Sequence, residues 1–291
     1  MPLHGGIALG QELEPRFYTN VPVDLNFVVL GFGRSEGGVL VDPAIELENA
    51  DIAIDGPFVA YARSLRLGSR SGKLDAGIAN VCLDGSADTD GERVSRHVCG
   101  WTDARVRLTI NLAGAPPLRM QDFGVYRQNL VVGASFALSV PVGDYDSDKL
   151  VNIGTNRWAA KLEVGASKAW RRWLLELSLA STRFEDNDDF FGGRLRKQDP
   201  IHAVQVHLVR GFDSGAWLSL GSTWYRGGET ETDGLDNGNL QSNARFGVTL
   251  SVPVNPRHSL KFNVSTGVET RTGSDFDTAG LAWQYLWGPA R

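Results

Sequence analysis

Apolar and polar residues alternate one by one over many segments of this chain, and this alternation restricts its fold more than any other feature. In residues 104–112 the polar positions are Arg105, Arg107, Thr109 and Asn111, and the apolar positions are Val106, Leu108, Ile110 and Leu112. Residues 157–167, 244–252, 260–269 and 279–287 show the same pattern. A period of two residues places the two sets on opposite faces of a β-strand, whereas a helical period of about 3.6 residues would mix them. These segments are therefore predicted to be strands with one apolar and one polar face.

The number and length of such segments predict a transmembrane barrel. Further segments indicate strands with less regular alternation, namely 23–33, 56–67, 72–82, 129–142, 173–184, 201–212 and 216–226. The total of about twelve is even, as in single-chain bacterial outer-membrane barrels, and about ten residues suffice for a tilted strand to cross a bilayer. No run approaches the roughly 18 apolar residues of a membrane-spanning helix. We predict an all-β fold, an up-and-down antiparallel barrel, as one domain over residues 21–291.

The connections between the predicted strands alternate between long and short. The long connections are 34–55, 83–101, 143–156, 185–200, 227–243 and 270–278, and the short ones are 68–71, 171–172, 213–215 and 255–257. Outer-membrane barrels have short periplasmic turns and long external loops. The pattern predicts that both termini are periplasmic and that six long loops are external. Segment 115–128 is long where a short turn is expected, so it is predicted to carry a small helix or a plug.

Tryptophans gather near the ends of the predicted strands, on or beside the apolar face. They are Trp158, Trp173, Trp217, Trp224, Trp283 and Trp287. Aromatic residues at these positions are typical of the girdles at the two membrane interfaces. A soluble protein with tryptophan in its core is the alternative, but such residues would favour strand middles.

If the apolar faces contact lipid, the polar faces line the interior of the barrel. This set comprises Arg63, Lys73, Asp75, Arg105, Arg107, Lys161, Glu163, Glu176, Gln205, His207, Arg245, Lys261, Asn263, Glu269 and Gln284. A barrel of about eight strands is filled by side chains and one of about sixteen holds a water channel, so twelve strands lie between these limits. The charges could line a weakly selective pore for small polar or anionic solutes, or they could pair and seal the lumen.

The two cysteines, Cys82 and Cys99, bracket a polar segment rich in turn-forming residues. A disulfide between them would fit an oxidising compartment such as the periplasm or the cell surface. The alternative is two unrelated thiols. A zinc site is not favoured, because only His97 is nearby and no CxxC motif is present.

The first twenty residues are expected to be the remnant of a signal peptide followed by an N-terminal periplasmic segment. Ala8 and Gly10 resemble the small residues of a signal-peptide cleavage site. The charged and apolar regions that normally precede such a site are not in this sequence. A translation start placed too late in the gene would account for this.

Charge and motifs disfavour several other functions. The net charge of −5 and the absence of a basic stripe argue against nucleic-acid binding. The acidic loop 185–189 could hold calcium, and loop 229–239 has a similar composition, but both lack EF-hand spacing and are expected to be solvated. A barrel enzyme would need a nucleophile beside a base, and His207 with Ser219 is the candidate pair. No GxSxG, HExxH or nucleotide-binding motif is present, so no enzyme activity, metal or cofactor is predicted.

The chain resembles the bacterial outer-membrane transporter-like family labelled "putative MetA-pathway of phenol degradation". The stretches that carry the resemblance are LEPRFYTNVPVDLNFVVLGFGRSEGGVLVDP (13–43), YRQNLVVGASF (126–136), YDSDKLVNIGTNRW (145–158), DNDDFFGG (186–193), QSNARFGVTLSVPVN (241–255) and DFDTAGLAWQYLWG (275–288). The resemblance implies a β-barrel that transports small molecules, with a loose link to aromatic compounds. It implies no catalytic residues. The expected partners are membrane lipid, lipopolysaccharide and a small solute, and a monomer is favoured. A barrel with a closed lumen that serves a structural or ligand-binding role is the main alternative.

Overall fold

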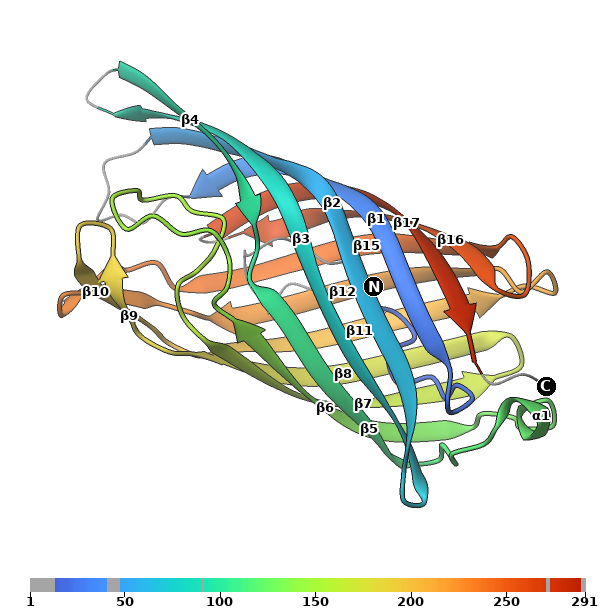
Figure 1. The fold of residues 1–291 in the computed structure, drawn as a ribbon. Coiled ribbons are helices and arrows are strands. Elements are labelled where there is room, and N and C mark those ends of the chain that lie inside the picture. The colour runs from blue at the N-terminus through green and yellow to red at the C-terminus, as the bar shows by residue number, and fades with distance from the viewer. Residues whose placement is uncertain (1–13, 41–47, 90–91, 271–272, 289–291) are drawn as a thin grey trace.

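Twelve antiparallel strands close into a barrel in the computed structural model, which describes residues 14–40, 48–89, 92–270 and 273–288 (Figure 1). The strands are β1 (Asn26–Leu40), β2 (Glu48–Leu67), β3 (Arg70–Thr89), β5 (Ala104–Ala113), β6 (Leu130–Val140), β7 (Ala159–Trp170), β8 (Trp173–Phe184), β11 (Ile201–Gly211), β12 (Trp217–Gly227), β15 (Gln241–Pro253), β16 (His258–Thr270) and β17 (Gly273–Trp287). Each pairs with its neighbours along the chain, and β1 pairs with β17 to close the ring. The predicted fold and its twelve strands are confirmed.

One end of the barrel extends well beyond the other, because several strands are longer than the ten or so residues that cross a bilayer. Both β2 and β3 have 20 residues. Residues 80–89 of β3 pair with β4 (Glu92–Trp101), whereas residues 72–77 of β3 pair with β5. The predicted loops 34–55 and 83–101 are thus largely strand. Alternation is weak there because these extensions have no lipid to face.

A second, smaller sheet lies at the same end. Its strands are β9 (Asn187–Phe190), β10 (Arg194–Gln198), β13 (Thr230–Thr232) and β14 (Leu235–Asp236), in the order β14-β13-β10-β9. They come from the predicted loops 185–200 and 227–243, so these connections are ordered rather than irregular. At the opposite end the turns are short, as predicted, and Gly68 has a φ of 63° in the turn between β2 and β3.

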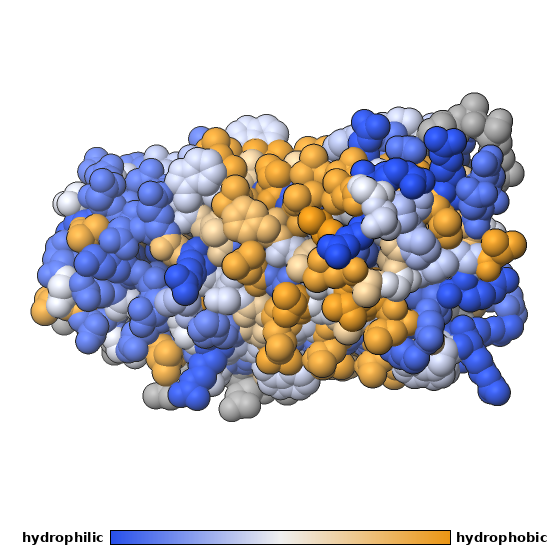
Figure 2. Space-filling view, turned by 90° about the horizontal axis from the view of Figure 1, so that it is seen from below, coloured by the Kyte–Doolittle hydropathy of each residue, from blue (hydrophilic) through white to orange (hydrophobic). Residues whose placement is uncertain are grey.

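The outer surface of the barrel carries an apolar belt. Leu162, Leu179 and Phe32 expose 63%, 52% and 51% of their surface on outward-facing positions. Figure 2 shows the apolar residues as a band across the middle of the barrel, with hydrophilic residues at both ends. Exposed aliphatic and aromatic side chains in a continuous belt fit the hydrocarbon core of a bilayer. Within the described residues, no helix is long and apolar enough to cross a membrane.

Most of the predicted girdle tryptophans lie on the outward face. Trp158, Trp224 and Trp287 are exposed, and Trp283 stacks against Tyr285 on the outside of β17. Trp173 lies under the guanidinium of Arg210, 4.8 Å from the ring centre. Trp217 is the exception and corrects the prediction: it faces the lumen, where it contacts Arg16 and Lys261. The alternation at the start of β12 is ambiguous, because Trp217 and Leu218 are both apolar.

The predicted disulfide is confirmed. Cys82 on β3 and Cys99 on β4 are directly opposite each other in the ladder and are bonded. The segment that they bracket is an antiparallel hairpin rather than an irregular loop.

Candidate functional site in the barrel interior

The barrel interior is polar and tightly packed at its middle. The structure places thirteen of the predicted lumen residues on inner faces of the strands: Lys73, Asp75, Arg105, Arg107, Lys161, Glu163, Glu176, Gln205, His207, Arg245, Lys261, Asn263 and Gln284. Most of them are buried, including both arginines of β5. Their charges are held in contact with one another rather than in open water.

Two predicted lumen residues are not placed there. Arg63 is exposed on the outer face of β2, opposite Asn26. The inward positions of this strand include Ala60 and Ala62, whose small apolar side chains resemble a lipid-facing set, and this misled the assignment of faces. Glu269 belongs to β16, but its side chain lies outside the described ones.

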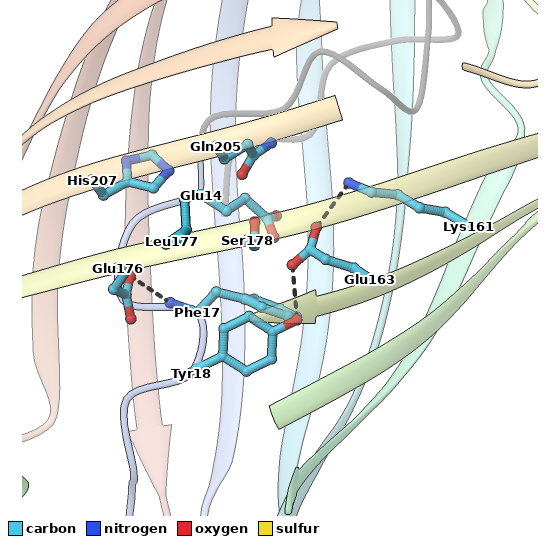
Figure 3. Close-up of a pocket in the computed structure, with 10 residues that line it drawn as sticks. All are labelled: Glu14, Phe17, Tyr18, Lys161, Glu163, Glu176, Leu177, Ser178, Gln205 and His207. Atoms are coloured by element: carbon cyan, nitrogen blue, oxygen red, sulfur yellow. Dashed lines mark hydrogen bonds and ion pairs between the residues drawn. The ribbon is translucent and has the colours of Figure 1, made fainter. Parts of the chain in front are cut away.

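The segment that precedes β1 enters the lumen and packs against this polar wall (Figure 3). Residues 14–20 were expected to be part of a segment outside the barrel, and instead they lie inside it. The expected signal-peptide remnant falls largely on residues 1–13, which lie outside the described residues. We call residues 14–20 the plug segment.

Glu14 anchors the plug segment to two arginines. Its carboxylate accepts a hydrogen bond from Arg105 at 3.2 Å and forms an ion pair with Arg107. Arg107 also pairs with Asp75 on β3 at 3.1 Å. Burial alone would raise the pKa of the Glu14 carboxyl, but the neighbouring positive charges, with Arg107 the strongest, and the Arg107 hydrogen bond together lower the pKa to about 2. Glu14 is therefore charged at neutral pH and locks the segment to β5.

Tyr18 fills the lumen beside Glu14 and is 1% exposed. Its hydroxyl donates to Glu163 at 3.0 Å, and Glu163 pairs with Lys161 at 3.2 Å. The ring approaches the backbone of β6 and β7 at glycines: a Cβ at Gly165 would lie 2.3 Å from Tyr18 Cε2, and one at Gly133 would lie 2.4 Å from Cδ1. Both positions need glycine because any side chain would displace the ring.

Backbone groups of the plug segment bind the opposite wall. The amides of Arg16 and Phe17 donate to the Glu176 carboxylate on β8, the latter at 3.2 Å. The ring of Phe17 lies 4.1 Å from the Arg107 guanidinium and 4.5 Å from the Lys73 ammonium. Cation–π contacts of this kind favour burial of both groups.

The segment is also tied to the rim of the barrel. Asn20 donates to Pro116 at 3.0 Å and accepts a hydrogen bond from Ser71 at 2.9 Å. Val23 donates to the carbonyl of Leu118 at 2.9 Å. Segment 115–128 carries the short helix α1 (Met120–Phe123), as expected, and it supports the plug segment at the rim rather than filling the lumen.

A small cavity lies beside the plug segment. The cavity that it leaves against β7, β8 and β11 has room for about one water molecule. His207 and Glu176 border this cavity, and both His207 nitrogens and Glu176 Oε1 have no hydrogen-bond partner among the described residues. The structure therefore has a narrowed lumen with polar groups available to a passing water or solute.

A second part of the interior is apolar. Val29, Phe58, Ala60, Ala79, Val81, Leu83 and Ala282 form a buried cluster on the inner faces of β1, β2, β3 and β17. Ile153, from the connection between β6 and β7, packs against it together with Val151. The interior therefore offers an apolar wall in addition to the charged one, which the sequence analysis did not identify.

Asp103 holds the connection between β6 and β7 in place. Its carboxylate accepts hydrogen bonds from the Gly143 amide at 3.0 Å and from Thr155 Oγ1 at 2.6 Å. Gly143 and Gly154 lie so close that a Cβ on either would clash with the other's backbone. Residues 143–155 thus form a closed loop, anchored at its neck, that presents Ile153 to the lumen.

Replacing Asp103 by alanine is expected to free this loop, because three hydrogen bonds at its neck are lost together. Amide hydrogen exchange of residues 144–155 should become faster by at least an order of magnitude. Asp148→Ala, in the same loop but exposed, is the matched control and should change exchange little. Equal exchange in the two variants would show that Asp103 does not hold the loop.

His207 and Ser219, the candidate base and nucleophile, are not joined by a hydrogen bond. Ser219 Oγ and both nitrogens of His207 have no hydrogen-bond partner among the described residues, so the candidate nucleophile and base do not contact each other. The acidic residues of 185–189 form no metal-ligand group in the described part of the chain.

Comparison with known proteins identifies both a family and a fold. The family model described as "Putative MetA-pathway of phenol degradation" matches residues 32–285. The structure is similar to that of the COG4313 outer membrane channel from Pseudomonas putida F1, with a TM-score of 0.77 and 20% identity, covering 95% of this chain and 100% of that one. The translocator domain of the autotransporter NalP from Neisseria meningitidis is also similar, with a TM-score of 0.54 and 8% identity, covering 90% and 88%. No curated protein matches the chain.

Proposed function

Since the chain belongs to the family described as "Putative MetA-pathway of phenol degradation", we propose that it is a passive outer-membrane channel for small, largely apolar solutes. The observation that carries the proposal is the pairing of an apolar inner wall with a charged wall, both inside a lipid-embedded barrel. An open porin would have a polar lumen throughout. The apolar wall around Phe58 and Ala282 is covered by Ile153, so an apolar or aromatic solute contacts it when the loop that carries Ile153 moves, and the family description supports an aromatic class.

The plug segment makes this a gated channel rather than an open one. Glu14, Phe17 and Tyr18 occupy the middle of the lumen, so a solute passes only when they move. Polar and charged contacts hold the segment, and their hydrogen bonds can be replaced by water when the segment leaves the wall. This gives a physical route for opening without unfolding of the barrel.

The two unequal ends of the barrel support a proposed orientation in the membrane. The short turns, α1 and the C-terminal end of β17 lie together, and the extended hairpins lie at the other end (Figure 1). With long connections external, as in known barrels, the plug segment enters from the periplasmic side. The external hairpins are then placed to contact lipopolysaccharide, and we propose a monomer because one chain closes the ring.

A test of the apolar route is the variant Ala282→Arg. It places a charge in the apolar cluster, where an aromatic solute would be desolvated, and it should lower uptake of a labelled aromatic solute by intact cells that express the protein. Ala282→Leu adds bulk without charge and is the matched control. Heat-modifiable gel migration checks that both fold. If Ala282→Arg transports aromatic solutes as well as wild type, the apolar wall is not the path.

A further inference from the structure

Four potential metal ligands lie together on the outer face of the hairpin formed by β3 and β4, away from the lumen. Cys82 faces Cys99 in the ladder, and Asp84 faces His97 two residues further along. The intervening residues Val81 and Leu83 are buried in the apolar cluster, so the four ligands point outward. The side chains of Asp84 and His97 are 62% and 63% exposed, and Cys99 is exposed as well, so dissolved ions and reductants can reach the cluster.

Asp84 fixes the state of the His97 ring. Its Oδ1 lies 2.6 Å from His97 Nδ1, and a carboxylate can only accept, so Nδ1 carries the proton. In the neutral ring Nε2 then has a free lone pair, which lies 3.5 Å from Cys99 Sγ. A disulfide sulfur carries no hydrogen to donate to it. A histidine oriented by a carboxylate behind it, with the other nitrogen free, is the usual arrangement of a metal ligand.

We propose that Cys82, Cys99 and His97 form a redox-gated site for a zinc-like divalent cation, closed in the disulfide form and opened by reduction. One ligand atom from each of the three residues lies within 4.8 Å of the others. Ligands around a tetrahedral zinc ion lie about 3.3–3.8 Å apart, so small side-chain rotations complete the site once the sulfurs separate. Water takes the fourth position, and Asp84 orients His97 from behind.

The chemistry balances with a phosphine as the reductant. The phosphine takes the oxygen of one water molecule and becomes its oxide, and the disulfide takes up two electrons and two protons to give two thiols. Binding of the cation then releases both thiol protons, because thiolates are the ligands. The disulfide form therefore excludes the metal, and the reduced form binds it.

Cobalt(II) titration of the full chain in detergent micelles tests the site. Cobalt serves as a spectroscopic probe for zinc, since thiolate ligands give charge-transfer absorption and a tetrahedral site gives intense visible bands. After phosphine reduction, confirmed by thiol counting, one equivalent of cobalt should produce these bands and zinc should displace it. Untreated, disulfide-bonded protein should show no bands.

Substitutions distinguish cobalt binding by the three proposed ligands from nonspecific cobalt binding. His97→Ala should abolish the tetrahedral bands, and Asp84→Asn should weaken binding by about 10–100-fold, as loss of an orienting group does. His202→Ala removes an exposed histidine elsewhere on the outer surface and should bind like wild type. The proposal is overturned if reduced wild type shows no bands, or if His97→Ala binds cobalt as tightly as wild type. Channel conductance is measured separately and is independent of either result.

Discussion

Replacing Glu14, Phe17 and Tyr18 together by alanine should raise the single-channel conductance of the barrel several-fold. These three side chains make most of the side-chain contacts that hold the plug segment in the middle of the lumen, while the backbone hydrogen bonds to Glu176 and the rim contacts of Asn20 remain. Their loss should leave the segment free to move out of the constriction. The measurement is conductance in planar bilayers, with the wild type under the same salt.

The opened pore should also prefer anions. Among the described wall residues that face the segment, five are cationic and three are anionic: Lys73, Arg105, Arg107, Lys161 and Lys261 against Asp75, Glu163 and Glu176. A net positive constriction attracts anions. Thr19→Ala, within the same segment, is the matched control and should conduct like wild type. If the triple variant conducts no better than this control, the plug segment does not limit flow.

Replacing Arg107 by glutamine is expected to cost about 3–5 kcal/mol of unfolding free energy, because it leaves two buried carboxylates without their shared partner. Arg107 pairs with both Glu14 and Asp75, and its side chain is only 5% exposed. Urea-induced unfolding in detergent micelles, followed by tryptophan fluorescence, would measure the loss.

A second substitution distinguishes charge from packing. The double variant Asp75→Asn/Arg107→Gln also removes the charge of Asp75, whereas Glu14 keeps its contact with Arg105, and it should recover a substantial part of the stability. Asp75→Asn alone should be milder than Arg107→Gln, since Glu14 still satisfies the guanidinium. A loss below about 1 kcal/mol for Arg107→Gln would mean that water already solvates this cluster.

The sequence predicted the barrel well because lipid imposes alternation on every spanning strand. Arg105, Arg107 and Val106 could be assigned to opposite faces from their order alone. The assignment failed where that rule does not hold: Arg63 lies on a strand whose inward positions include the apolar Ala60 and Ala62, and Trp217 begins a strand with two apolar residues in succession. The disulfide could be anticipated because two cysteines bracket one predicted connection.

The plug segment could not be predicted, because its contacts join residues that are distant in sequence. Tyr18 meets Glu163 and Glu14 meets Arg107 only after the barrel has closed around them. One signal was present in the sequence: Gly133 and Gly165 interrupt two otherwise regular strands, and glycine in a strand often marks a close approach by another part of the chain.

The position of the plug segment restricts the order in which the barrel can assemble. The segment leads into β1, and β1 must pair with β17, which follows the other barrel strands along the chain. Its binding partners come from β3, β5, β7 and β8, so these strands must be in place before the segment can seat. β1, which follows the plug segment, is thus the strand that closes the barrel. Joining the first and last strands confines the segment within the ring, and insertion into the membrane ends with a lumen that is already occupied.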